Sequence, residues 1–283
     1  MTYTPGTPGV PDNHANHSGA QAHQGRRRPA TIRNEHLRYF SARDEPLAEK
    51  APKVTRRSSI SVSVLLDDGS VETFTHQTPT QLFLEEVCAR FARGTLIATR
   101  NGPIAIEDLR PGDRIRTGDN SHETLRWVSA CTLPEAADDM GDRFWPIRIR
   151  ADALGELRPI QDLIAAPHFR ILSNHPSCNA LFGSPETLAP VSDLFDGDMI
   201  TRMRPAADLM FYNLMFDTHQ IIEANGLKTE SYHPGNYGVA VMSFEQQSHL
   251  RRLMPHLRGD LDRFGRTVRP VLRGFEAEAL RVG

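Results

Sequence analysis

An eight-residue segment occurs twice in the sequence, at 108–115 and again at 193–200. The two copies read Asp-Leu-Arg-Pro-Gly-Asp-Arg-Ile and Asp-Leu-Phe-Asp-Gly-Asp-Met-Ile, and they are identical at five of the eight positions. Each copy contains a Gly-Asp turn signal and ends on an apolar residue, so each is expected to lead from a turn into a strand. Such self-similarity predicts a β-rich unit built twice, with the two copies related by an internal pseudo-symmetry.

Short apolar segments separated by frequent turns continue from about residue 95 to residue 235. Asn101-Gly102 and Asn225-Gly226 are strong signals for two-residue hairpin turns. Strands are expected at 96–98, 104–106, 114–116, 125–128, 146–150, 169–172, 199–201, 209–216 and 220–224. Short strands with frequent turns indicate an all-β body and not a doubly wound sheet.

A smaller unit is expected before this body, at residues 53–87. Apolar residues alternate from Ile60 to His76 around an Asp-Asp-Gly-Ser turn at 67–70, which is typical of a β-hairpin. The capping box at 78–81 then predicts the start of a helix, and Gly94 offers its end. Leu84, Val87, Cys88 and Phe91 would share one face of that helix.

The two ends of the chain have different compositions. Residues 1–52 are rich in Pro, Gly, His, Arg and Ala with almost no apolar periodicity, so they are expected to be a disordered tail. A second capping box at 243–246 precedes Leu250, Leu253, Met254 and Leu257, and a short helix is expected at 274–280. The predicted organisation is a tail (1–52), a hairpin and helix (53–87), an all-β domain (88–235) and a C-terminal helical appendage (236–283).

Composition narrows the classes of partner. The formal net charge is only −2, from 33 Lys and Arg against 35 Asp and Glu, which gives no general electrostatic case for nucleic acid or an anionic membrane. The three cysteines form no CxxC pair, so neither a disulfide framework nor a thiolate zinc site is expected. We expect no cofactor and no metal. Without a long apolar run or a signal-peptide core, the expected location is the cytoplasm, with signal-independent export left open.

Several blocks between residues 88 and 235 occur in the order of one known family. They are Phe-Ala-Arg-Gly-Thr-Leu-Ile-Ala-Thr at 91–99, Ile-Glu-Asp-Leu-Arg-Pro-Gly-Asp at 106–113, Tyr-Asn-Leu at 212–214, Asp-Thr-His at 217–219, Ala-Asn-Gly at 224–226 and Glu-Ser-Tyr-His-Pro-Gly at 230–235. Together they resemble the bacterial Hint (hedgehog/intein) family. The resemblance implies a mainly β, pseudo-two-fold horseshoe. It also implies self-processing by an N-to-S or N-to-O acyl shift, in which a Cys or Ser attacks the carbonyl before it and a His supplies a proton.

The sequence departs from the family at the nucleophile. Alignment places Arg90 where the resemblance implies a cysteine, and a guanidinium that stays protonated cannot attack a carbonyl. Cys88 lies two residues upstream, so a local shift could make Val87-Cys88 the scissile bond. Against this, Cys88 falls inside the expected helix and could equally be a small apolar helix residue.

The family's middle block, which aligns with residues 165–170, also departs from the family pattern. Phe169 occupies the position of the family's histidine, and His168 is one residue away, which in a strand places its side chain on the opposite face. Asp217 and His219 match the family's closing Asp-x-His and would share one face if extended, although an ordinary polar turn contact explains them equally well. No His-Asn pair follows, so splicing is not expected.

The candidate catalytic residues are therefore Cys88, His168, Asp217 and His219. Our hypothesis is a degenerate Hint protein of the self-processing class, because nucleophile and histidine act as one unit and both are replaced. One alternative is an active N-terminal autoprotease, at most single-turnover, that uses Cys88 with His168 or His219 as the proton donor. Another is a non-catalytic module that binds a partner protein or peptide by strand addition.

Overall fold

The computed structural model describes residues 57–79, 90–118, 121–135, 141–142, 145–174, 177–234, 244–261 and 264–272. All of them belong to one compact unit, Leu37–Gly283. The tail expected at 1–52, most of the helix expected after residue 78 (including Cys88) and the helix expected at 274–280 lie outside the described residues.

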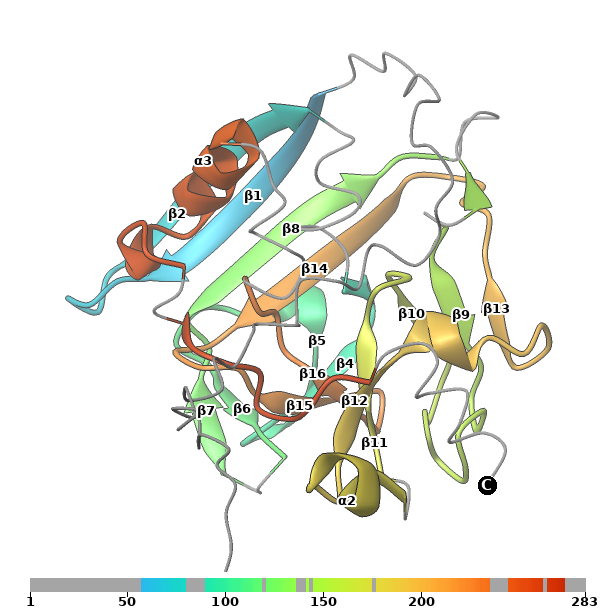
Figure 1. The fold of residues 1–283 in the computed structure, drawn as a ribbon. Helices are drawn as coiled ribbons and strands as arrows, with labels where there is room; N and C mark the ends of the chain where they lie inside the picture. The colour runs from blue at the N-terminus through green and yellow to red at the C-terminus, as the bar shows by residue number, and fades with distance from the viewer. Residues whose placement is uncertain are drawn as a thin grey trace, which may run out of the picture. The chain divides into compact units, whose positions relative to one another are not determined.

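Two sheets of eight strands each form the body (Figure 1). The first sheet has the order β13-β9-β10-β3-β14-β8-β1-β2, and all of its neighbouring strands are antiparallel. Its strands are β1 (Arg57–Leu65), β2 (Val71–Pro79), β3 (Phe91–Ala92), β8 (Trp127–Leu133), β9 (Ile147–Ile149), β10 (Leu163–Ala165), β13 (Ile200–Arg202) and β14 (Leu209–Met215).

The second sheet has the order β12-β11-β16-β15-β4-β6-β7, with β5 paired on β4. Its strands are β4 (Leu96–Thr99), β5 (Gly102–Ala105), β6 (Arg114–Arg116), β7 (His122–Thr124), β11 (Arg170–Ser173), β12 (Thr187–Pro190), β15 (Ile221–Ala224) and β16 (Leu227–Glu230). The α-helices are α2 (Ser177–Phe182) and α3 (Phe244–Leu253), and the short 3-10 helices are η2 (Ile106–Asp108), η4 (Val191–Leu194) and η6 (Pro255–Leu257).

Each copy of the sequence repeat forms the same local structure. The first passes from η2 through a turn into β6, and the second from η4 through a turn into β13. Gly112 and Gly197 stand at equivalent turn positions with φ of 102° and 80°, a conformation that favours glycine. The prediction that each copy leads from a turn into a strand is therefore confirmed. The two copies enter different sheets, because β6 belongs to the second sheet and β13 to the first.

The predicted hairpin turns also form. The β15–β16 turn has positive φ at both Asn225 (48°) and Gly226 (80°), as a two-residue type I′ turn requires. The Asn225 side chain also holds the neighbouring strand, because its Oδ1 accepts from the Leu96 backbone N–H at 2.7 Å. The hairpins expected around 67–70 and at Asn101-Gly102 form as β1–β2 and β4–β5.

The structure corrects the expected helix at both of its ends. Thr78 and Pro79 do not cap a helix but end β2, where Pro79 pairs with Arg57 of β1. Phe91 lies in β3, between Ala165 of β10 and Tyr212 of β14. Backbone pairing with strands far away in the sequence has overridden a local helical pattern at these positions.

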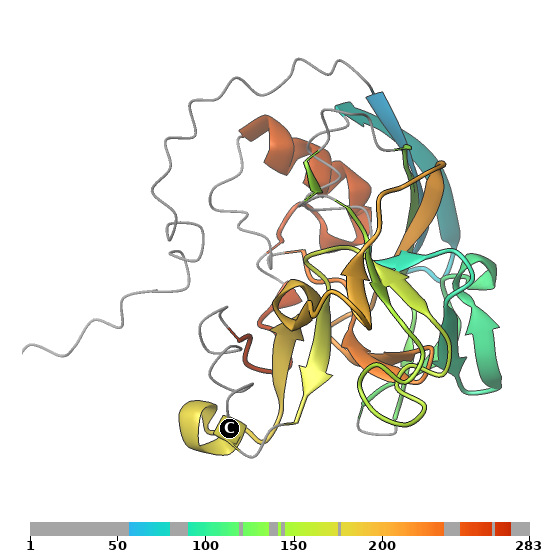
Figure 2. The same ribbon diagram turned by 90° about the vertical axis from the view of Figure 1, so that its right-hand side faces the viewer.

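Two large hydrophobic clusters and a small third one (Leu172, Leu188 and Ile221) hold the body together. The larger is built from both sheets, with members such as Ile97, Ile115, Ile149 and Leu214. In the second, α3 and η6 pack on β1, β8 and β14 on one face of the first sheet (Figures 1 and 2). The predicted helix after residue 243 is therefore present as α3. Residues 264–272, by contrast, continue as irregular chain against the body and form no long helix.

Candidate functional site

The position at which the resemblance implies a nucleophile lies at the entry to β3. Arg90 is 3% exposed, and its carbonyl accepts a hydrogen bond from the Ala166 N–H. The turn after β3 is fixed by Glu107, whose carboxylate accepts from the Gly94 N–H at 2.9 Å. The motif block at 91–99 is thus hydrogen-bonded to the block at 106–113, and this contact fixes the path of the chain just after residue 90.

The guanidinium of Arg90 is engaged in a buried ion pair. Its Nη1 lies 2.5 Å from Oε1 of Glu230, whose side chain is fully buried at the end of β16. The other carboxylate oxygen, Oε2, lies 3.3 Å from Nη1 of Arg170 and 3.3 Å from Nε2 of His219. We call Arg90, Arg170, His219 and Glu230 the Glu230 cluster.

The electrostatics of the cluster favour an ionised Glu230. Burial raises the pKa of this carboxyl, because a charge is poorly solvated inside the protein. The two guanidinium groups of Arg90 and Arg170 and the hydrogen bond from His219 outweigh that effect, so the pKa of Glu230 ends below its usual range. The site is therefore a carboxylate held between two cations and not a proton donor.

Both ring nitrogens of His219 are occupied. Nδ1 accepts a hydrogen bond from the Val268 N–H at 3.1 Å, so the ring proton resides on Nε2. Nε2 then donates toward the Ser231 carbonyl at 3.1 Å, with the Glu230 carboxylate nearby. In this arrangement the imidazole acts as a structural bridge between the closing motif and the C-terminal segment.

Two aromatic side chains extend the cluster. Tyr232 is 2% exposed; Arg90 stands over its ring at 5.6 Å, and the ring stacks on Trp127. His233 meets the ring of His219 edge-on at 5.2 Å and donates to the Gly265 carbonyl at 3.0 Å. Burial and the neighbouring His219 lower the pKa of His233 to about 4, so this ring is neutral at neutral pH.

The middle block presents a phenyl ring to the interior. Phe169 is 1% exposed and packs edge-on against Phe91 with ring centroids 5.1 Å apart. His168 lies in the turn before β11 and is exposed. Residues 168 and 169 point to opposite sides, as expected, because His168 is exposed whereas Phe169 is buried.

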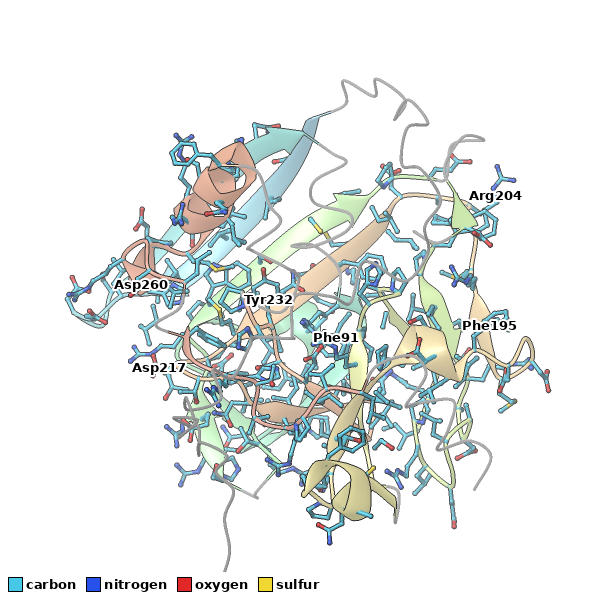
Figure 3. The ribbon with its side chains drawn as sticks, in the orientation of Figure 1. Phe91, Phe195, Arg204, Asp217, Tyr232 and Asp260 are labelled. Carbon is cyan, nitrogen blue, oxygen red and sulfur yellow. The ribbon has the colours of Figure 1, made fainter. Side chains whose placement is uncertain are left out.

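Asp217 does not share an environment with His219, contrary to the expectation for an extended Asp-x-His. The segment bends after β14, which leaves the Asp217 side chain 67% exposed while His219 is buried. Figure 3 shows Asp217 at the margin, apart from Phe91 and Tyr232. Asp217 binds Arg126, whose Nε lies 2.9 Å and 3.0 Å from the two carboxylate oxygens.

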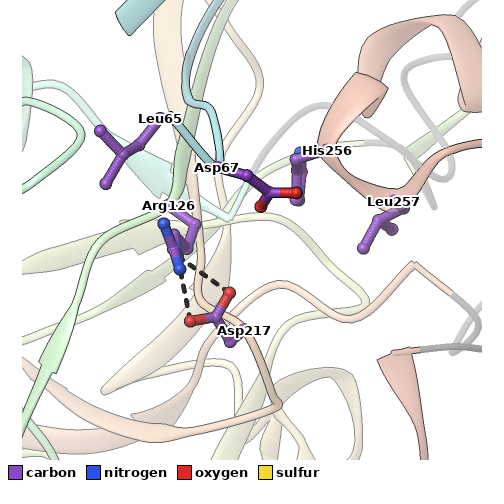
Figure 4. Close-up of a pocket in the computed structure, with 6 residues that line it drawn as sticks. All are labelled: Leu65, Asp67, Arg126, Asp217, His256 and Leu257. Carbon is purple, nitrogen blue, oxygen red and sulfur yellow. Dashed lines mark hydrogen bonds and ion pairs between the residues drawn. The ribbon is translucent and has the colours of Figure 1, made fainter. Parts of the chain in front are cut away.

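A small pocket adjoins this ion pair (Figure 4). Its volume is about 280 Å³, and it is lined by Leu65, Asp67, Arg126, Asp217, His256 and Leu257. Both ring nitrogens of His256 are buried and have no hydrogen-bond partner among the described residues. Burial lowers the pKa of His256 to about 4, although Asp217 opposes the shift.

The described part of the chain contains no group of three or more His, Cys, Asp or Glu side chains placed to hold a metal ion. Among the same residues, no helix is both long and apolar enough to cross a bilayer. Cys131 and Cys178 are free thiols buried in the structure, and Cys88 lies outside the described residues.

Comparison with family models matches residues 88–236, more than half of the 283 residues, to the Hint domain. The chain belongs to the Hint domain family. Comparison with curated proteins finds no match. Among solved structures, the chain is similar to the solution structure of a bacterial intein-like domain from Clostridium thermocellum, with 10% identity, a TM-score of 0.32, and coverage of 50% of this chain and 98% of that one. This structural likeness is weak, so the membership of the chain in the Hint family rests on the match of residues 88–236 to the family model.

Within this Hint domain, Glu230, Arg170 and His233 were not among the candidate residues expected from the sequence. Glu230 and His233 stand inside the recognised Glu-Ser-Tyr-His-Pro-Gly block, so their positions were visible although their roles were not. Arg170 directly follows Phe169, which aligns with the family's middle-block histidine. Their convergence depends on β11 and β16 being neighbours in the second sheet, which no local pattern reveals.

Proposed function

We propose that this Hint domain does not cleave itself and that it has kept the family fold as a non-catalytic scaffold. The observation that carries the proposal is the ion pair of Arg90 with Glu230 at the position of the family's nucleophile. An acyl shift needs a thiolate or alkoxide there, and a guanidinium has no lone pair to offer at physiological pH. The buried carboxylate partner holds the guanidinium in place.

The arrangement of the histidines supports the same proposal. Phe169 fills the position of the family's middle-block histidine with an apolar ring packed on Phe91. His219 has both nitrogens engaged, and His168 is exposed outside the cluster. A general acid must lie within hydrogen-bond reach of the leaving nitrogen, so the engaged nitrogens of His219 and the exposed position of His168 support a domain without a free proton donor.

Intact-mass measurement of the full-length chain tests the proposal. The purified protein is incubated with and without dithiothreitol or hydroxylamine, nucleophiles that release a thioester or ester by cleaving the chain. The expected result is the full-length mass in every condition. The active alternative, with Cys88 as nucleophile, predicts a fragment that begins at Cys88 in the wild type and is absent from Cys88→Ala. That fragment would refute the proposal.

A restoration series makes the test sharper. Arg90→Cys together with Phe169→His returns both groups whose loss is proposed, and we expect thiol-dependent cleavage before residue 90 in this double variant. Arg90→Cys with Phe169→Leu is the matched control, since it keeps the thiol and lacks only the histidine. Cleavage of Arg90→Cys alone, at the rate of the double variant, would show that position 169 has no part in the chemistry.

A further inference from the structure

The segment from Phe264 to Leu272, which we call the C-terminal strap, lies against the body as irregular chain (Figure 1). It follows α3 and η6 and reaches the edge of β12. Its backbone binds β12, His219 and His233, and the side chains of Phe264, Arg269, Val271 and Leu272 also contact the domain. This is the pattern of a bound peptide.

The strap adds to an edge strand. β12 is the outermost strand of the second sheet, so one side of its backbone is free to pair. The Leu188 N–H donates to the Pro270 carbonyl, and the Leu272 N–H donates to the Leu188 carbonyl, both at 2.8 Å. Together they form a parallel bridge between Leu188 and Val271. Strand addition of this kind is a general mode of peptide recognition.

Two imidazole rings bind backbone groups of the strap, one at Gly265 and one at Val268. His219 Nδ1 accepts from the Val268 N–H at 3.1 Å, and His233 Nε2 donates to the Gly265 carbonyl at 3.0 Å. Both histidines belong to the closing part of the Hint motif. These contacts reach backbone groups, which all peptides share, but the bound chain is bent, and Gly265 has a φ of 83° that favours glycine at that position.

Selectivity resides in the side chains at the ends and at Arg269. Phe264 and Leu272 are each 2% exposed, and Phe264 meets His233 edge-on at 5.0 Å. Arg269 Nε lies 2.8 Å from Oε2 of Glu186. Val268, which lies between Phe264 and Leu272 in the strap, is 37% exposed. The surface thus accepts two apolar anchors with a cation between them.

We propose that the edge of β12, with His219, His233 and Glu186, is a peptide-docking site whose resident occupant is the C-terminal strap. A displacing partner is a segment of another protein that copies the strap, with a glycine after its first large apolar residue and a cation before its second apolar anchor. Such a partner pairs with β12 in parallel once the strap is released. This role goes beyond the loss of cleavage and does not depend on it.

A binding experiment on the full-length chain tests the docking site. The probe is a fluorescently labelled synthetic peptide with the sequence of residues 262–274, and its anisotropy is measured against wild type, Leu272→Asp and Val268→Asp. Leu272→Asp removes a buried anchor and opens the site. Val268→Asp changes an exposed side chain but keeps the backbone N–H that binds His219, so it is the matched control.

We expect the peptide to bind Leu272→Asp at least about tenfold more tightly than wild type or Val268→Asp, because a tethered strap competes at an effective concentration on the order of millimolar. Equal binding to all three proteins overturns the proposal. Equal binding of a scrambled peptide, or no binding to a folded Leu272→Asp, also overturns it.

Hydrogen exchange of the wild-type chain decides the matter if Leu272→Asp does not fold. The amides of Val268, Leu272 and Leu188 are expected to exchange at least about tenfold faster than the hydrogen-bonded amides of β14, through a local opening that leaves the sheets intact. Exchange of both sets at one common rate would mean that the strap opens only when the whole domain unfolds, and the proposal would then be wrong. Neither measurement reads out self-cleavage, so the two proposals fail separately.

Discussion

The ring of Phe169 meets the ring of Phe91 edge-on, with centroids 5.1 Å apart and an interplanar angle of 71°. Phe169 stands where the family's middle block has its histidine, and Phe91 directly follows the position of the nucleophile. Edge-to-face aromatic pairs add about 0.5–1.5 kcal/mol to the stability gained by burial alone. At this point the domain therefore has an apolar contact that stabilises the fold.

Removing the carboxylate of the Glu230 cluster should strongly destabilise the domain. Glu230→Gln leaves Arg90 buried without its ionised partner, and we expect the free energy of unfolding to fall by about 3–5 kcal/mol. Asp67→Asn is the control, because the Arg258–Asp67 pair is about two-thirds exposed on both sides and should contribute at most about 1 kcal/mol. Urea unfolding gives both values. Equal effects would show that the buried pair has no special role.

Stability should fall as the pH is lowered from about 6.5 to about 4. Burial lowers the pKa values of His233 and His256 to about 4 in the folded state, whereas both are near 6.5 in the unfolded chain. Between these values the unfolded state binds more protons, so protonation favours unfolding by up to about 3 kcal/mol per histidine.

Below the ordinary glutamate pKa of 4.5, Glu230 should add to this loss. Its folded pKa is lowered, so its contribution is present above the unfolded value and disappears as the pH falls further. Urea midpoints at pH 7.5, 5.5, 4.5 and 3.5 measure the profile, and the step below pH 4.5 reports on Glu230. A midpoint that does not change between pH 7.5 and 5.5 would contradict the assignment to the two histidines.

His256→Phe should stabilise the domain, and more so at acidic pH. The substitution replaces two buried ring nitrogens, which have no partner among the described residues, with an apolar ring of similar shape. We expect a rise of about 2–4 °C in Tm for each kcal/mol gained, and a shallower pH dependence. His122→Gln, at a half-buried position in β7, is the control. A lower Tm for His256→Phe would indicate that the imidazole makes a favourable contact in solution.

Two glycines with the same backbone conformation should respond differently to alanine. Gly226 and Gly197 both have φ of 80°, which costs an alanine about 1–2 kcal/mol. At Gly226 a Cβ atom would also lie 2.9 Å from Cγ2 of Ile160 and 3.0 Å from the Leu157 carbonyl oxygen, whereas at Gly197 it would meet nothing within 4 Å. Thermal unfolding should therefore show a larger loss for Gly226→Ala. Equal losses would mean that the loop at 157–160 moves aside freely.

Local chemistry made part of the fold predictable. Asn225-Gly226 specifies its turn because both residues tolerate positive φ, and the alternating residues after Ile60 specify a hairpin because side chains in a strand alternate between faces. The short strands β10 and β12 were missed, since three or four apolar residues carry no period. The helix expected to include Phe91 was wrong there, because pairing with Ala165 and Tyr212 decides the conformation.

The sequence by itself determined the repeat, the hairpins and the resemblance to the Hint family, and it predicted that Arg90 stands in place of the nucleophile. Only the tertiary structure decided what Arg90 does, because its partner Glu230 is 140 residues away in the chain. It likewise separated Asp217 from His219 and brought Val268 onto the ring of His219. Turn and strand signals act over a few residues, whereas a buried ion pair depends on the register of whole sheets and on the exclusion of water from both partners.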